Sequence, residues 1–199
     1  MQPMKMKKSE ITKRRILDAA ARMFRKKGYA ATTLTDIATL VGIRAAGIYY
    51  HFESKDELFA SVLDMGIDRV FEAVRTAVEG LPTGATHKEK ISVALETHLM
   101  TLLRHGDYTA ANIINFTLAP RPIRARNRER REIYGDYWKK LLGDAQEAGE
   151  IRPDVDLSLF RLYLIGALNW SEEWYQPDGK SISEMATQCA SFFFKGVEP

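Results

Sequence analysis

The sequence is poor in cysteine and has no long apolar run. It holds a single cysteine, Cys189, which excludes an internal disulfide and makes a reducing cytoplasm the expected location. The longest apolar run, "LFRLYLIGALNW" over residues 159–170, is too short to span a bilayer and contains Arg161. The basic start "MQPMKMKKSE" is not followed by an apolar stretch. We therefore expect neither a secretory signal nor a membrane partner.

The sequence also lacks the signatures of common enzyme and metal sites. It contains no glycine-rich phosphate loop after a strand, no Ser/His/Asp order of a known type, and no paired carboxylates that can be assigned to a cleft. No Cys/His/Asp cluster has the spacing of a zinc site. His98 and His105 share one helical stripe, so a metal pair stays open as an alternative to two core or rim histidines. We expect no catalytic activity, no cofactor and no metal.

Charge is distributed unevenly along the chain. The net charge is +3, but residues 1–55 hold twelve Lys and Arg against four Asp and Glu, which leaves the remaining residues at −5. A basic segment attached to a mildly acidic remainder suggests a polyanion partner. A basic face that is merely solvated explains the charge equally well.

Apolar spacing predicts helices almost throughout and no strand, so the expected fold class is all-α. Ser9 is the expected N-cap of the first helix, and Thr33 with Asp36 and Ser54 with Glu57 form capping boxes for two others. We expect one domain over residues 1–54 and a second over 55–199. The expected helices cover 10–27, 34–41, 44–51, 55–79, 88–105, 107–118, 123–148, 156–175 and 181–195.

Residues 33–51 read as a helix, a tight turn at Gly42 and a second helix. This is the helix-turn-helix pattern, whose second helix enters the DNA major groove. The alternative is that the aromatic residues after the turn belong to the core, and we accept it for Phe52. Tyr49 and Tyr50 are adjacent and point about 100° apart on a helix, so at most one of them can be fully buried. The candidates to face DNA phosphates are therefore Tyr49, Tyr50, His51 and Lys55.

The stretch "YAATTLTDIATLVGIRAAGIYYHFESKDELF" over residues 29–59 closely resembles the DNA-binding signature of the TetR family of bacterial transcriptional regulators. The preceding "ITKRRILDAAARMFRKKG" resembles the first helix of that family. The resemblance implies an all-α homodimer in which three N-terminal helices form a helix-turn-helix DNA-binding domain. A larger C-terminal helical domain would bind a small effector and dimerise.

Positions that match the family signature imply specific DNA contacts. Arg44 stands where the family usually has a Ser or Thr cap, and it could read a guanine or bind a phosphate. Ala45 and Ala46 could touch thymine methyl groups. The resemblance implies phosphate and groove contacts at Thr33, Thr35, Tyr49, His51 and Lys55, and a base-reading helix start at Arg44, Ala45, Ala46 and Gly47.

The ending "LIGALNWSEEWYQPDGKSISEMATQCASFFFKGV" over residues 164–197 resembles the KstR-like branch of that family. The resemblance implies control of lipid or sterol degradation and an acyl-coenzyme A effector. The apolar helices 156–175 and 181–195 would form a four-helix bundle with their two-fold copies. The expected dimer residues are Leu164, Ala167, Met185, Cys189 and Phe193.

An anionic effector would need a cationic anchor and an apolar cavity. Arginine forks suit phosphates, so the Arg-rich run 121–131 is a candidate anchor. The alternative is a solvated helix face on which Glu129 and Glu132 pair locally. The expected cavity lies between residues 88–118 and 156–175, although core or interface packing also explains its tryptophans. The expected ligand residues are Arg121, Arg124, Arg126, Arg128, Trp170 and Trp174.

Together these features predict a DNA-binding repressor that is released from a palindromic operator by a small molecule. One alternative is a regulator of efflux genes that responds to hydrophobic or cationic drugs, which would need the cavity but not the arginines. Another is an architectural protein that coats DNA without regard to sequence.

Overall fold

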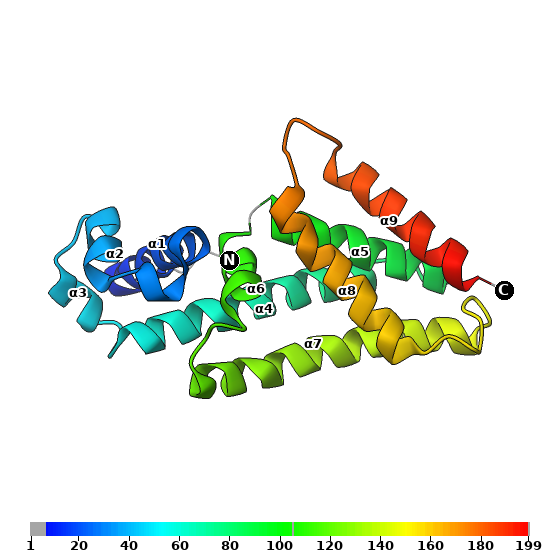
Figure 1. Ribbon diagram of the computed structural model, residues 1–199, viewed down its shortest axis with the longest axis horizontal. Helices are drawn as coiled ribbons and strands as arrows, with labels where there is room; N and C mark the ends of the chain where they lie inside the picture. The colour runs from blue at the N-terminus through cyan, green and yellow to red at the C-terminus, as the bar shows by residue number, and fades with distance from the viewer. Residues whose placement is uncertain (1–6, 105, 199) are drawn as a thin grey trace. The chain divides into compact units, whose positions relative to one another are not determined.

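A computed structural model describes residues 7–104 and 106–198, and every regular element in these ranges is an α-helix (Figure 1). The predicted all-α class is confirmed. None of the described helices combines the length and apolar character that a membrane crossing requires. The helices are α1 (Lys8–Ala31), α2 (Leu34–Val41), α3 (Ala45–Tyr49), α4 (Lys55–Glu79), α5 (His87–Leu103), α6 (Asp107–Asn115), α7 (Arg121–Glu147), α8 (Leu157–Trp174) and α9 (Ile182–Val197).

The described residues group into two compact units. The first unit comprises the described residues through Gly66 together with 107–127, and the second comprises those of 67–106 and 128–198. The first unit therefore contains α1, α2, α3 and α6, although α6 follows α3 by nearly sixty residues. The long helices α4 and α7 each contribute residues to both units.

The first unit has its own apolar core. The aromatic ring of Phe24 from α1 meets that of Phe59 from α4 edge-on, with 4.8 Å between centroids. Phe52 is 1% exposed, as predicted for a core residue. Other fully buried members of this core are Ile16, Ile37, Ile48, Leu58 and Leu63.

Capping signals in the sequence correctly predicted both ends of α2 and the start of α4. Thr33 Oγ1 accepts the Asp36 N–H at 3.1 Å, and Asp36 Oδ2 accepts the Thr33 N–H at 3.2 Å, which is the predicted capping box. Gly42 ends α2 in the left-handed conformation, with φ +74°. Ser54 Oγ accepts the Glu57 N–H at 3.1 Å, as predicted for the start of α4.

Several predicted helix boundaries differ from the observed ones, among them the starts of α1 and α7 and the ends of α3 and α6. The helix α1 begins at Lys8, so Ser9 lies inside its first turn; Glu10 Oε2 instead accepts the Lys7 N–H at 2.8 Å. The reading helix α3 ends at Tyr49 rather than at residue 51. The helix α7 begins at Arg121 rather than 123, because Pro122 in a first turn removes only an N–H that has no helical partner there.

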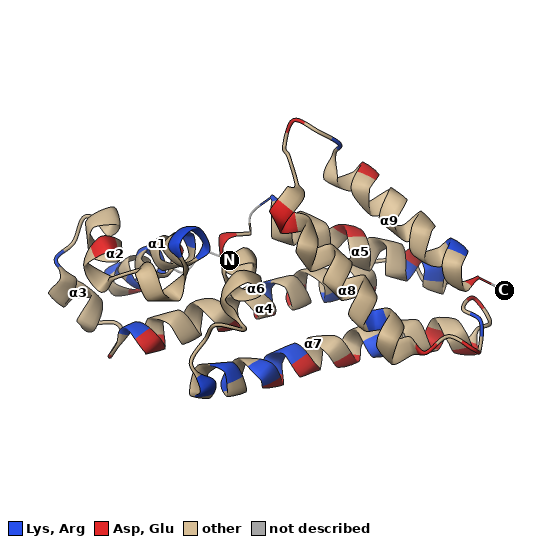
Figure 2. Ribbon diagram, viewed as in Figure 1, with Lys and Arg blue, Asp and Glu red and all other residues tan. Residues whose placement is uncertain are grey.

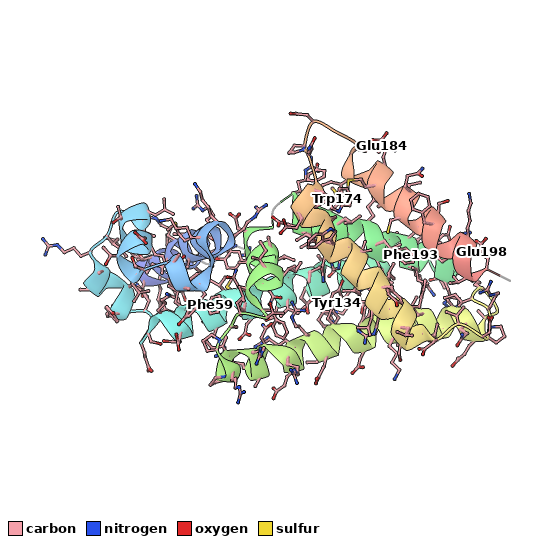
Figure 3. All side chains as sticks on the ribbon, viewed as in Figure 1. Phe59, Tyr134, Trp174, Glu184, Phe193 and Glu198 are labelled. Atoms are coloured by element: carbon pink, nitrogen blue, oxygen red, sulfur yellow. The ribbon has the colours of Figure 1, made fainter. Side chains whose placement is uncertain are left out.

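The second unit is built around a core of side chains from α4, α5, α7, α8 and α9. Trp138 of α7 is fully buried in it, and Leu164 and Leu168 of α8 are each 1% exposed. Tyr134, which lies on α7 (Figure 3), is 5% exposed and packs against the rings of Phe71 and Trp138.

A buried histidine joins three helices of this unit. His98 of α5 is 2% exposed, and its Nδ1 lies 2.8 Å from the Tyr134 hydroxyl of α7. Its Nε2 lies 3.2 Å from Asn169 Oδ1 of α8. Because the amide oxygen can only accept, Nε2–H donates to it and the Tyr134 hydroxyl donates to Nδ1. His98 is thus a core histidine with two partners. His105, the second histidine of the possible metal pair, lies outside the described residues.

The buried His98 should make stability depend on pH. Burial lowers the pKa of His98 from 6.5 to about 4, so between these values the unfolded chain binds a proton that the folded chain does not. The free energy of unfolding should therefore fall by about 2 kcal/mol when the pH drops from about 7 to about 5. Denaturant unfolding at fixed protein concentration should show this fall for the wild type and for His87→Gln, a half-exposed control on the same helix. If His98→Gln shows the same fall, His98 is not its source.

Candidate functional site

Four of the predicted DNA contacts come together in the first unit. Thr33, Thr35, Tyr49 and Lys55 all line one surface depression of about 490 Å³, between the start of α2, the end of α3 and the start of α4. Two helix N-termini, which carry partial positive charge, border this depression, and Glu53 contributes a carboxylate to its lining. Tyr49 is 59% exposed.

Lys55 rests on an aromatic ring that sequence reasoning missed. Its Nζ lies 4.2 Å from the centroid of Tyr29, within cation–π range. The Tyr29 hydroxyl donates a hydrogen bond to Asp56, and burial together with this carboxylate raises the pKa of Tyr29 to about 12. No local pattern links Tyr29 to Lys55, because 26 residues separate them. The aromatic residue directly after Gly28 was the only available signal.

The predicted base-reading residues stand at the start of α3. Arg44 is its N-cap residue, yet the side chain makes no capping hydrogen bond and is exposed. Ala46 is exposed, and Ala45 and Gly47 are half-buried. At the other end Tyr50 is 80% exposed, so neither tyrosine belongs to the core. His51 is half-buried, and its ring meets Tyr50 edge-on at 5.0 Å.

Lys and Arg residues recur along α1 (Figure 2). Arg15 has a structural task as well: its Nη2 donates to the Val41 carbonyl oxygen at 2.7 Å and so caps the end of α2. No local pattern predicts this bond, because Arg15 and Val41 are 26 positions apart. The exposed cations of α1 include Lys8, Lys13, Arg14, Arg22, Lys26 and Lys27.

In the second unit, helix α8 turns an apolar stripe outward. Tyr163 is 70% exposed and Trp170 is 66% exposed, so the helix is not buried on several sides by its own chain. Of the predicted dimer residues, Ala167 lies on this stripe, and Met185, Cys189 and Phe193 of α9 are half-buried. Leu164 instead packs in the core and has almost no surface left for a partner. The outward stripe comprises Leu159, Leu162, Tyr163, Ala167, Trp170 and Trp174.

An apolar pocket of about 490 Å³ lies between α5, α8 and α9. Trp174, near the C-terminal end of α8, and Phe193 of α9 both line it (Figure 3). Lys180 contributes a cation to the lining. Trp170 does not line this pocket, although it was expected in a cavity wall. The third wall is α9, which the sequence reading had not assigned to the cavity.

The arginines of α7 have different surroundings. Arg126 Nη2 lies 2.6 Å from Asp64 Oδ2, a carboxylate of α4 that is 7% exposed. Arg130 Nη1 lies 2.6 Å from Asp68 Oδ2, also on α4. These partners replace the predicted local pairing with Glu129 and Glu132. Arg124 donates to the Thr117 carbonyl at 3.2 Å, while Arg121 and Arg128 are exposed and form no ion pair within the described residues.

Comparison with known proteins identifies matches to both halves of the chain. The family model described as "Bacterial regulatory proteins, tetR family" matches residues 16–62. The model described as "Tetracyclin repressor-like, C-terminal domain" matches residues 84–197.

Similar proteins include named repressors. The HTH-type transcriptional repressor KstR2 of Mycobacterium tuberculosis is 28% identical over 181 residues, which cover 87% of this chain and 86% of that protein. Its solved structure has a TM-score of 0.81 at 25% identity, covering 94% of this chain and 95% of that one. The structure of AibR in complex with isovaleryl coenzyme A and operator DNA also has a TM-score of 0.81 at 25% identity, covering 94% and 98%.

Proposed function

Since the chain belongs to the TetR family of bacterial regulatory proteins, we propose that it is a homodimeric transcriptional repressor released from a palindromic operator by a small-molecule effector. The observation that carries this proposal is the depression lined by Thr33, Thr35, Tyr49 and Lys55 beside an exposed reading helix. The repressor named KstR2 and the operator complex of AibR support it. Such a protein acts on cytoplasmic DNA.

The reading helix favours a particular kind of half-site. Arg44 is the one long hydrogen-bonding side chain at the start of α3, and it is not used as a cap. We propose that it contacts a guanine, with Ala45 and Ala46 against thymine methyl groups. Phosphate contacts from Thr33, Thr35, Tyr49, Tyr50, His51 and Lys55 would set the register.

We propose that the outward stripe of α8 and the exposed face of α9 form the dimer interface. An apolar face of this extent is unfavourable in water, and a two-fold copy of the same face would cover it. Phe192 of α9 is 71% exposed and would join the stripe. Trp170 is therefore assigned to the interface rather than to a ligand cavity.

We propose an acyl-coenzyme A thioester as the effector. The apolar pocket between α5, α8 and α9 suits an acyl chain. Because Trp174 and Phe193 belong both to its lining and to the proposed interface, the acyl chain would lie beside the two-fold contact. Exposed Arg128 and the pocket residue Lys180, both in the second unit, are candidates for coenzyme A phosphates. Arg126 is the weakest candidate, because moving it would leave the buried Asp64 without this partner. The isovaleryl coenzyme A bound to AibR supports this class of ligand.

A hydrophobic or cationic drug is the second candidate effector. The observation that favours it is the apolar lining of the same pocket, which needs no phosphate anchor. Either ligand would release DNA only by preferring a dimer that cannot fit the operator, and a hundredfold preference corresponds to about 2.7 kcal/mol.

The DNA contacts can be tested by salt dependence. Lys55→Ala should weaken binding to all duplexes alike and lower the slope of log affinity against log salt by roughly one, because one phosphate contact is lost. Tyr49→Ala should weaken binding as well. Fluorescence anisotropy over a salt series measures both quantities. Lys139→Ala, which removes an exposed charge from the second unit, is the control and should bind like the wild type. Unchanged affinity and slope in Lys55→Ala would show that the depression is not the phosphate site.

The dimer interface can be tested by one charge. Trp170→Asp should produce monomers, because a carboxylate buried in an apolar interface without a partner is strongly disfavoured. Analytical ultracentrifugation at micromolar concentration measures the change. Leu118→Asp, at an equally exposed leucine outside the stripe (73% exposed), should leave the dimer intact. A Trp170→Asp dimer of unchanged affinity would place the interface elsewhere.

The effector class can be tested by calorimetry with a small panel: acyl-coenzyme A esters, the free acids, coenzyme A and cationic drugs. We expect the esters alone to bind tightly. Arg128→Ala with Lys180→Ala should weaken the esters by removing charge-assisted bonds to phosphate. Arg130→Ala removes an arginine already paired with Asp68 and is the matched control. Equal binding by the free acids, or no effect of the double change, would leave only an apolar pocket.

A further inference from the structure

The helix α1 is broken at Gly28, and the break creates backbone groups that need partners. Gly28 has φ +74° and ψ 170°, a conformation open to glycine because it has no side chain. A break of this kind leaves the following N–H and the preceding carbonyls without their usual helical partners. The N–H of Tyr29 and the carbonyl of Phe24 stand on the two sides of it.

One side chain from a distant part of the sequence satisfies both groups. Asn115, the last residue of α6, is fully buried, and its Oδ1 accepts the Tyr29 N–H at 3.0 Å. Its Nδ2 donates to the Phe24 carbonyl at 3.0 Å and to the Ala111 carbonyl at 2.9 Å. A carboxylate could not donate, and an apolar side chain of similar size could do neither, so an amide is the group that this break requires.

Tyr29, whose N–H is bound by Asn115, provides the aromatic ring on which Lys55 lies. The ring of Tyr29 packs against Phe59 of α4 at 4.5 Å between centroids, on the segment where Figure 3 labels Phe59. The Lys55 ammonium lies 4.2 Å above that ring, and the Tyr29 hydroxyl donates to Asp56 beside it. Lysine side chains lose much rotamer freedom when they are held, so a fixed aromatic surface reduces the cost of presenting the ammonium to a phosphate.

We propose that Asn115 is a positioning residue for DNA binding: by fixing Tyr29, it holds Lys55 at the depression where a DNA phosphate would lie. The proposal rests on the proposed function, because Lys55 has to be a DNA contact. It assigns a DNA-binding role to a buried residue sixty positions beyond Lys55 in the sequence. All five residues involved, Phe24, Tyr29, Lys55, Asp56 and Asn115, belong to the first unit.

A double-mutant cycle on DNA affinity tests the proposal. The full-length dimer, Asn115→Ala, Lys55→Ala and the double variant are titrated onto a fluorescent mixed-sequence duplex at about 0.1 M salt. Losing one phosphate contact weakens binding roughly tenfold under these conditions. We expect Asn115→Ala to approach this loss and the double variant to bind no more weakly than Lys55→Ala alone. Losses that multiply in the double variant would overturn the proposal, because Asn115 would then act independently of Lys55.

Asn112→Ala is the matched control for general destabilisation. Asn112 is also a buried amide on α6, donating to the Leu63 carbonyl at 2.7 Å and to Asn127 Oδ1 at 2.9 Å. It should lower the melting temperature as Asn115→Ala does, yet retain wild-type DNA affinity. Equal DNA affinity in Asn112→Ala and Asn115→Ala would overturn the positioning role.

A second variant keeps the test decisive if Asn115→Ala does not fold. Tyr29→Leu keeps the backbone N–H and its bond to Asn115 but removes the ring under Lys55. Its loss of affinity should likewise disappear in the Lys55→Ala background, and a loss that persists there would overturn the proposal. A wild-type dimer that binds no duplex at all would instead overturn the proposed function, and this inference with it.

Discussion

Backbone groups exposed by a helix break have to find hydrogen bonds elsewhere, and the break at Gly28 brings α6 into the first unit. Asn115 supplies those bonds, while Tyr108 of the same helix donates to Asp18 of α1 at 2.7 Å. Gly66 of α4 permits a further close approach, because a Cβ there would lie 2.4 Å from the Tyr108 carbonyl oxygen. The DNA-binding helices are therefore assembled on a helix that the sequence places far downstream.

Local signals in the sequence were sufficient for much of the fold. The capping boxes at Thr33 and Ser54 involve residues three apart, so propensity and spacing reveal them directly. The contacts of Asn115 with α1 and the stacking of Lys55 on Tyr29 join residues 26 to 91 positions apart. Without knowledge of which helices pack together, no pattern in the sequence points to them.

Helix α8 shows why an apolar pattern did not identify the buried side. Apolar residues surround much of this helix, so Leu164 and Tyr163 were equally plausible for the interior. The structure buries Leu164 and turns Tyr163 and Trp170 outward. The buried side, which includes Leu164, and the outward stripe lie only about 100° apart around the helix axis. Packing of the whole unit decides which of them faces the core. The same limit applies to the arginines of α7, because Asp64 and Asp68 lie about sixty positions earlier.

We propose that this chain recognises a specific two-fold DNA sequence through the start of α3. Selection of bound duplexes from a random pool, followed by sequencing, tests it most directly. We expect enrichment of one pseudo-palindrome whose half-sites each contain a guanine, and we expect Arg44→Ala to lose that guanine preference. Binding without enrichment of any sequence would contradict the claim and favour a protein that coats DNA without reading it.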